Sequence, residues 1–266
     1  MSPFFFESMQ HIQLQNKTIA VQTIRVEQNR NEHIILVFLH EALGSIGQWK
    51  AFPELLCKKL QLDGFVYERQ GHGSSSPFSN ERTASYLHDY AWDELNKLIQ
   101  TAFPSDKKII LVGHSDGGTI ALLYAAKFPK NVLACVTMAA HVINEPETIA
   151  GIQPAIEAYE AGKLVGLTKY HGVKTESLFY AWARTWKSDE FKDWDICKDI
   201  QSISCPVFAI QGSTDQYGTE KQLDLIKTNV SGKVKTIMIS NCGHQPHLEV
   251  PEHVLSEIQQ FFTSEN

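Results

Sequence analysis

Residues 109–124 constrain the fold of this chain more than any other stretch. An apolar, β-branched run ends at Gly113, and a run with helical spacing begins just after Ser115. Between them lies Gly113-His114-Ser115-Asp116-Gly117, a G-x-S-x-G pattern that is typical of a nucleophile elbow when a strand precedes it and a helix follows. Such a turn gives Ser115 a positive φ, and the two glycines remove side chains that would collide there. We therefore expect Ser115 to present its hydroxyl at a helix N-terminus; an ordinary glycine-rich turn is the alternative.

The rest of the chain alternates strand patterns with helix patterns. Two short alternating runs, at 11–14 and 18–22, predict a hairpin at a sheet edge. Apolar runs predict further strands at 34–39, 64–67, 109–113, 132–138, 205–212 and 233–240, and helical spacing predicts helices at 49–60, 84–102, 116–124, 221–228 and 251–262. This order predicts an α/β fold with about eight mostly parallel strands and helices on both faces of the sheet.

The pattern changes between residues 141 and 204, which contain no convincing strand and have helical character. An all-helical insert within an α/β alternation predicts a cap over the carboxyl edge of the sheet, where open α/β sheets bind ligands. We therefore divide the chain into a core (1–140), a helical cap (141–204) and a second part of the core (205–266). Trp182 and Trp186 of the insert are candidate substrate-binding residues. The alternative is that they form the insert's own core.

Net charge, the length of apolar runs and the spacing of cysteines limit the kinds of partner and the cellular compartment that we expect. The formal net charge of −6 argues against a nucleic-acid partner. No stretch approaches the roughly 20 apolar residues that span a bilayer, and Phe4-Phe5-Phe6 is too short for a signal peptide. The five cysteines are scattered without a Cys-x-x-Cys pair, which favours reduced thiols in a cytoplasmic protein. We expect a small-molecule substrate, no membrane partner and no cofactor; the oligomeric state is left open.

A serine hydroxyl needs a base to activate it, and the base needs an acid to orient it. Asp215 lies in the loop after one predicted strand and His244 in the loop after the next. Because the carboxyl ends of parallel strands meet at one edge, we predict that Ser115, Asp215 and His244 form a catalytic triad in that chain order. His247 is the rival base. Asp116 and Asp224 are the rival acids, although Asp224 falls within a predicted helix.

The tetrahedral intermediate of acyl transfer also needs hydrogen-bond donors for its oxyanion, each commonly worth about 2.7–4 kcal/mol. The backbone N–H of Asp116, the residue after the nucleophile, is the first predicted donor. The second is the N–H of Ala42, in the loop after the strand at 34–39, with Leu43 as the alternative. The carboxylates of Glu41 and Asp116 would then flank a developing negative charge, so we expect neutralising partners, of which Arg69 and His40 are the nearest candidates by loop placement.

These residues together resemble the α/β-hydrolase fold superfamily over nearly the full chain. The matching motifs are Gly113-His114-Ser115-Asp116-Gly117-Gly118, the Asp215 loop, Gly71-His72-Gly73, and Gly243-His244 followed by Glu249 and Pro251. The resemblance implies eight mostly parallel strands, a helical cap after the sixth, and hydrolysis through an acyl-enzyme. Two positions depart from common family patterns: His40-Glu41 stands where many relatives have His-Gly, and Gln245 stands where carbon–carbon bond hydrolases often have Trp.

The sequence therefore predicts a metal-free serine hydrolase that cleaves a small, neutral ester or related acyl compound. His244 and His247 have no cysteine or carboxylate partner at metal-site spacing. A carbon–carbon bond hydrolase and an acyltransferase are the alternatives among enzymes, because both use the same triad. A hydrolase-fold receptor for a small molecule is the alternative from another class.

Overall fold

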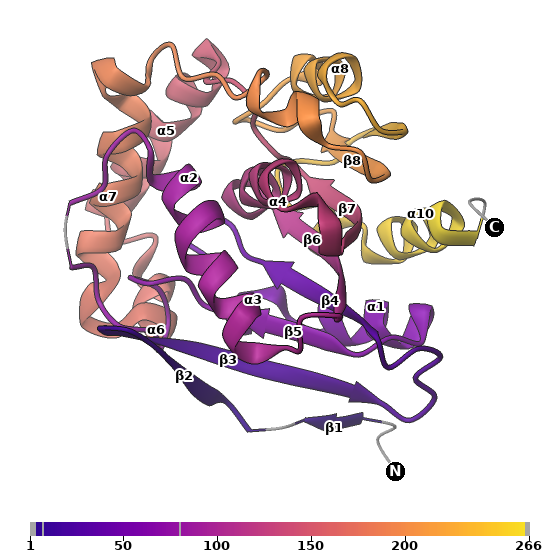
Figure 1. Ribbon diagram of the computed structural model, residues 1–266. Coiled ribbons are helices and arrows are strands. Elements are labelled where there is room, and N and C mark those ends of the chain that lie inside the picture. The colour runs from indigo at the N-terminus through magenta and orange to yellow at the C-terminus, as the bar shows by residue number, and fades with distance from the viewer. Residues whose placement is uncertain (1–3, 7, 80, 264–266) are drawn as a thin grey trace.

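The computed structural model describes residues 4–6, 8–79 and 81–263, and its centre is a twisted, mostly parallel sheet (Figure 1). Eight strands follow one another in the order β1-β3-β5-β4-β6-β7-β8-β9, and β2 pairs with β3 outside this path. Neighbours from β5 to β9 along this order are parallel, whereas β3 is antiparallel to β1, β2 and β5. The strands are β1 Phe4–Phe6, β2 Gln10–Leu14, β3 Lys17–Val26, β4 Ile34–Leu39, β5 Gly64–Tyr67, β6 Lys108–His114, β7 Val132–Met138, β8 Val207–Gly212 and β9 Val234–Ile239.

Helices cover both faces of the sheet, as the alternating pattern predicts. They are α1 Phe52–Leu60, α2 Tyr86–Asp89, α3 Asn96–Ala102, α4 Asp116–Lys127, α5 Pro146–Glu160, α6 Thr168–His171, α7 Thr175–Lys187, α8 Glu220–Asn229, α9 Pro246–Glu249 and α10 Pro251–Thr263. The helix predicted at 84–102 is continuous from α2 to α3, but its middle, Tyr90–Leu95, is π-helical. One extra residue in that turn is a change that periodicity does not reveal.

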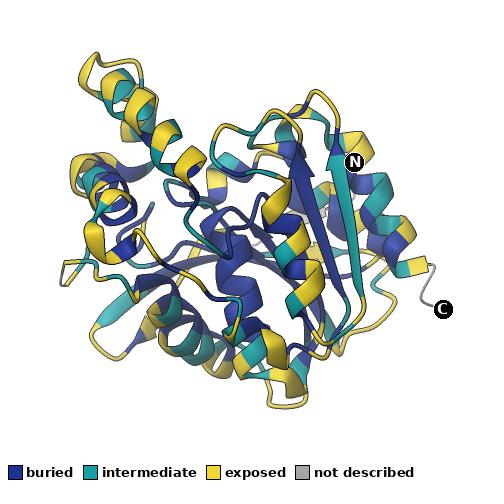
Figure 2. Ribbon diagram, turned by 90° about the horizontal axis from the view of Figure 1, so that it is seen from above, coloured by how far each residue is buried: buried dark blue, intermediate teal, exposed yellow. Residues whose placement is uncertain are grey.

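Two apolar layers, one on each face, hold the helices to the sheet. Side chains alternate along β4: Ile35, Val37 and Leu39 pack in the layer that includes α4, while Leu36 and Phe38 pack in the layer that includes α1 and α10. Helix α4 is buried along most of its length and stands at the centre of the molecule (Figure 2). The continuous apolar run of β4 is therefore explained by burial on both faces.

Residues 141–204, between β7 and β8, form the separate helical group α5–α7 at one side of the sheet (Figure 1). Its aromatic rings pack tightly: Phe191 stacks on Trp194 with centroids 4.9 Å apart, and Trp186 lies 4.8 Å from Phe191. Residues 143 and 195 add one isolated antiparallel bridge. The aromatic side chains of the insert thus pack against one another and continue into the apolar layer on the α4 face of the sheet. The division of the chain at residues 140 and 204 stays a prediction.

Replacement of Phe191 by alanine is expected to destabilise the protein. The ring is fully buried between Trp186 and Trp194, and deletion of a buried phenylalanine side chain typically lowers the free energy of unfolding by about 3–5 kcal/mol. Urea unfolding followed by circular dichroism measures the change. Val173→Ala is the control, because Val173 is fully exposed and its truncation should stay within about 0.5 kcal/mol of wild type. Equal stability of the two variants would contradict this packing.

Candidate active site

The turn between β6 and α4 has the geometry of a nucleophile elbow. Ser115 has φ 53° and ψ −121°, and α4 begins at the next residue. A Cβ atom on Gly117 would lie 1.9 Å from the carbonyl oxygen of Leu39, and one on Gly113 would lie 2.2 Å from the carbonyl oxygen of Gly117. Both positions therefore require glycine, as the motif predicts.

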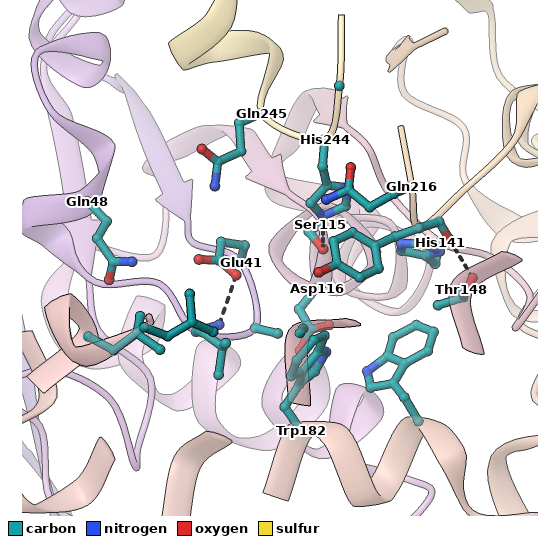
Figure 3. A pocket seen from close by; sticks show the side chains of 18 of the residues that line it. Glu41, Gln48, Ser115, Asp116, His141, Thr148, Trp182, Gln216, His244 and Gln245 are labelled. Atoms are coloured by element: carbon teal, nitrogen blue, oxygen red, sulfur yellow. Dashed lines mark hydrogen bonds between the residues drawn. The ribbon is translucent and has the colours of Figure 1, made fainter. Parts of the chain in front are cut away.

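Ser115, His244 and Asp215 form one hydrogen-bonded line. Nε2 of His244 lies 3.0 Å from Oγ of Ser115, and Nδ1 of His244 lies 2.8 Å from Oδ2 of Asp215. Because an ionised carboxylate only accepts hydrogen bonds, Nδ1 carries the proton and Nε2 is free to accept the serine proton. Figure 3 shows Ser115 and His244 adjoining at the cavity. The structure thus brings together the three residues that the sequence singles out.

Asp215 is held so that its charge faces His244. Its carboxylate also accepts hydrogen bonds from the backbone N–H of Tyr217 at 2.8 Å and from Nε2 of Gln211 at 2.7 Å. Burial by itself would raise the pKa of this carboxyl, but the hydrogen bond and the charge of His244, together with the Tyr217 N–H, lower it. Asp215 is therefore ionised whenever His244 needs an anionic partner.

The structure separates the rival groups from this line. His247 is buried against Trp49 and His114, and burial lowers its pKa to about 3. Asp224 lies in α8. A further histidine, His114 of the elbow, lies beside them, and its Nε2 donates to the carbonyl oxygen of His244 at 2.7 Å. His114 therefore supports the backbone of His244, a contact between residues 130 positions apart that no local pattern reveals.

In the loop after β4, the two candidate oxyanion donors differ in whether their N–H is already occupied. The Leu43 N–H is occupied, since it donates to Oε2 of Glu41 at 2.9 Å. Nη2 of Arg69 donates to the carbonyl oxygen of Glu41 at 2.8 Å, and a planar trans peptide then points the following N–H, that of Ala42, in the opposite direction. Among the described residues, the Ala42 N–H donates no hydrogen bond. This geometry favours Ala42 over Leu43 as the second oxyanion donor.

Asp116 offers its amide to the same place and turns its carboxylate elsewhere. Its N–H belongs to the first turn of α4 and so has no partner within the helix. Its Oδ2 accepts a hydrogen bond from the hydroxyl of Tyr86 at 2.9 Å. Burial raises the pKa of the Asp116 carboxyl, while the charges of Arg69 and Arg82 oppose that rise. The expectation that Arg69 neutralises the carboxylates directly is incomplete, because its hydrogen bonds go to the carbonyls of His40 and Glu41.

A cavity of about 520 Å³ joins these groups (Figure 3). The core contributes Ser115, His244, Ala42 and Asp116 to its wall, and the insert contributes Trp182 and Trp186, among others. No lysine or arginine is among its lining residues, whereas Glu41, Asp116 and Glu249 are. Trp186 also belongs to the insert's aromatic cluster, so it both lines the cavity and packs the insert.

Two searches of the described residues bear on metals and membranes. Among these residues, no group of three or more His, Cys, Asp or Glu side chains is arranged to hold a metal ion. In the same part of the chain, no helix has the length and apolar character to cross a bilayer.

The fold and the elbow define an α/β-hydrolase, and comparison with known proteins agrees. The model of the alpha/beta hydrolase fold family matches residues 34–161. The chain has the α/β-hydrolase fold, is similar to this family over that range, and is a hydrolase. Proline iminopeptidase of Saccharolobus solfataricus is 23% identical, with 88% of this chain and 84% of that protein covered. Serine hydrolase BPHL of Homo sapiens is 28% identical, with 86% and 79% covered.

A solved structure shows the same fold at low identity. MGS-M2, an α/β-hydrolase enzyme from a deep-sea metagenome library, has a TM-score of 0.76 and 18% identity, with 96% of this chain and 97% of that chain covered. The solved structure thus agrees with the family match on the fold, while the names of these relatives cover different substrates.

Replacement of His244 by alanine is expected to lower kcat by a factor on the order of 10⁴ or more with little change in KM, because the lost proton transfer occurs in the transition state. Steady-state hydrolysis of a p-nitrophenyl ester measures both constants. His247→Ala is the control: it removes a neighbouring buried imidazole that does not contact Ser115, so its kcat should stay within about tenfold of wild type. The assignment of the base is wrong if the two losses are equal.

Proposed function

We propose that the protein is a metal-free serine hydrolase that cleaves small esters through an acyl-enzyme. Ser115 Oγ attacks the carbonyl carbon while its proton moves to Nε2 of His244. The amides of Ala42 and Asp116 receive the oxyanion. When the intermediate collapses, His244 returns the proton to the leaving oxygen, and a water activated in the same way then releases the acid. The observation that carries this proposal is the 3.0 Å contact between Ser115 and His244 with Asp215 behind it.

The charge of the cavity supports an ester without a negative group. Glu41 and Asp116 lie in its wall and no cationic side chain does. At an effective dielectric constant of about 20, two like unit charges about 8 Å apart repel by roughly 2 kcal/mol. A substrate carboxylate near the scissile bond would meet this repulsion without compensation. Neutral esters therefore fit the site better than anionic ring-fission products, which makes carbon–carbon hydrolysis the weaker alternative.

A second candidate is hydrolysis of an acyl compound that carries an amine. The Glu41 carboxylate lines the cavity (Figure 3), where it could pair with an ammonium group. The name of one relative, proline iminopeptidase, agrees with this chemistry. Acyl transfer and ligand sensing use the same geometry but have no separate observation in their favour.

Labelling with a fluorophosphonate tests the proposal directly. Wild-type protein should react at Ser115, since the reagent phosphonylates a serine that a neighbouring base activates. Ser115→Ala should lose the label completely and also lose ester hydrolysis, as measured by intact-mass spectrometry and by p-nitrophenol release. Ser177→Ala, which removes an exposed hydroxyl of α7, is the matched control and should label like wild type. An unlabelled wild-type protein would favour a receptor over an enzyme.

Glu41→Gln tests the electrostatic selection. The change removes the charge and keeps an oxygen that can accept the Leu43 N–H. We expect kcat/KM for an anionic ester to rise about tenfold relative to its neutral analogue, a difference of about 1.4 kcal/mol, and kcat/KM for an amine-bearing ester to fall. Glu252→Gln is the control, because Glu252 is exposed at the start of α10 and does not line the cavity, so its change should leave this ratio as in wild type. A selectivity ratio that does not move in Glu41→Gln would exclude Glu41 from substrate selection.

A further inference from the structure

The insert contacts the core beside both predicted oxyanion donors. The first contact is made by His171 of α6, whose ring is buried. Its Nε2 lies 2.8 Å from the carbonyl oxygen of Leu43, and its Nδ1 lies 2.9 Å from the backbone N of Gly73. Since a carbonyl accepts and a backbone N–H donates, the ring carries its proton on Nε2 and uses both nitrogens. A side chain of the insert therefore fixes the peptide that follows the Ala42 loop.

The second contact is a hydrogen-bond chain that ends at the residue after the nucleophile. Nε1 of Trp186, in α7, donates to the hydroxyl of Tyr86 at 2.7 Å, and that hydroxyl donates to Oδ2 of Asp116 at 2.9 Å. All three side chains are buried, with exposed fractions of 2%, 3% and 1%. Because a tryptophan N–H only donates, the direction of both hydrogen bonds is fixed. Trp186 donates to the Tyr86 oxygen, and the Tyr86 hydroxyl hydrogen is then directed toward the Asp116 carboxylate.

We propose that the helical insert completes the oxyanion hole, with His171 and the Trp186–Tyr86 pair as positioning residues for the Ala42 and Asp116 amides. This inference rests on the proposed function, since it takes those two amides as the oxyanion donors. Leu43 and Asp116 both line the cavity, and the Leu43 carbonyl and the Asp116 carboxylate are each hydrogen-bonded to a group reached from the insert. Substrate binding under the insert and oxyanion stabilisation are thereby coupled through two hydrogen-bonded contacts.

The core also restrains the Ala42 loop, and its contacts define what the insert adds. Nε2 of His72 lies 3.0 Å from the carbonyl oxygen of Ala42 and its Nδ1 lies 3.1 Å from that of Gln70, so the neutral ring donates to one of the two, and Arg69 holds the carbonyl of Glu41. Of the carbonyls from residue 40 to residue 43, only that of Leu43 is bound by a side chain of the insert. Loss of His171 should therefore loosen the end of this loop without releasing the whole loop.

Three variants separate positioning from simple packing. Tyr86→Phe keeps the ring and removes the oxygen that links Trp186 to Asp116. His171→Leu removes both ring nitrogens, and His171→Asn restores a donor and an acceptor. Tyr170→Phe is the matched control, because the hydroxyl of Tyr170 bonds Lys50 between insert and core at an exposed position.

The readout compares a trifluoromethyl ketone with the corresponding secondary alcohol as inhibitors. The ketone adds Ser115 Oγ to its carbonyl carbon and forms a tetrahedral oxyanion, whereas the alcohol binds without one. Loss of an oxyanion donor costs about 10²–10³ in kcat, so a misplaced one should cost about tenfold. We expect Tyr86→Phe and His171→Leu each to lower kcat about tenfold and to weaken the ketone by the same factor. KM and the affinity for the alcohol should stay near wild type, and His171→Asn should recover part of the loss.

Unchanged ketone affinity in folded Tyr86→Phe and His171→Leu, or an equal loss for ketone and alcohol, would overturn the inference. Circular dichroism establishes folding, and Tyr86→Phe carries the test if His171→Leu does not fold, because it deletes a single oxygen. A loss in Tyr170→Phe equal to that in the other variants would point to general loosening of the insert and would also overturn it. Failure of wild-type Ser115 to label with a fluorophosphonate instead contradicts the proposed function itself, so the two failures are distinguishable.

Discussion

The close approach of helix α4 to the end of strand β4 is the constraint on which the site depends. Gly117 packs so tightly that a Cβ atom there would lie 1.9 Å from the carbonyl oxygen of Leu39 and 2.6 Å from that of His40. Only glycine permits this contact. It brings the start of α4, with the free amide of Asp116, against the loop that carries Ala42. Two donors from separate parts of the chain can therefore face one oxyanion because a side chain is missing at residue 117.

Three uncharged histidine rings hold the loops around this contact by hydrogen bonds to the backbone. His114 and His171 donate a ring N–H to the carbonyl oxygens of His244 and Leu43. The ring of His72 lies between the carbonyl oxygens of Ala42 and Gln70 and donates to one of them. Burial lowers the pKa of each of these rings, so they remain uncharged donors at neutral pH. A lysine in their place would add a positive charge beside the nucleophile. A serine or threonine hydroxyl rotates, so its donor would be held less rigidly than the N–H of a histidine ring. The rings therefore orient backbone without changing the charge of the site.

The sequence predicts the parts of this site that follow from local pattern and sheet order. The glycines of the elbow require a tight turn, and Asp215 and His244 follow successive strands, so parallel pairing brings them to Ser115. Choosing between Ala42 and Leu43 needed the structure, because the peptide plane is set by Arg69, a residue 27 positions beyond Ala42. His171 and Tyr86 were not predicted at all. Their roles arise from how the insert docks on the core, and neither helical spacing nor residue type carries that information.

The carboxylates near the oxyanion are tolerated because each is turned away or occupied. The Asp116 carboxylate accepts a hydrogen bond from the Tyr86 hydroxyl. The guanidinium carbon of Arg82 lies 4.8 Å from the centroid of the Tyr86 ring, so a positive charge lies next to this hydrogen-bonded pair. Glu41 receives the Leu43 N–H, which also removes the competing donor from the oxyanion hole. Burial raises the pKa of both carboxyl groups, because the low dielectric disfavours their charged forms.

The same carboxylates still oppose an anionic substrate, because a negative group entering the cavity meets no cation in its wall. Selection against anions and stabilisation of the oxyanion can therefore coexist: the amides of Ala42 and Asp116 act over hydrogen-bond distance, while the carboxylates act over the longer range of charge repulsion.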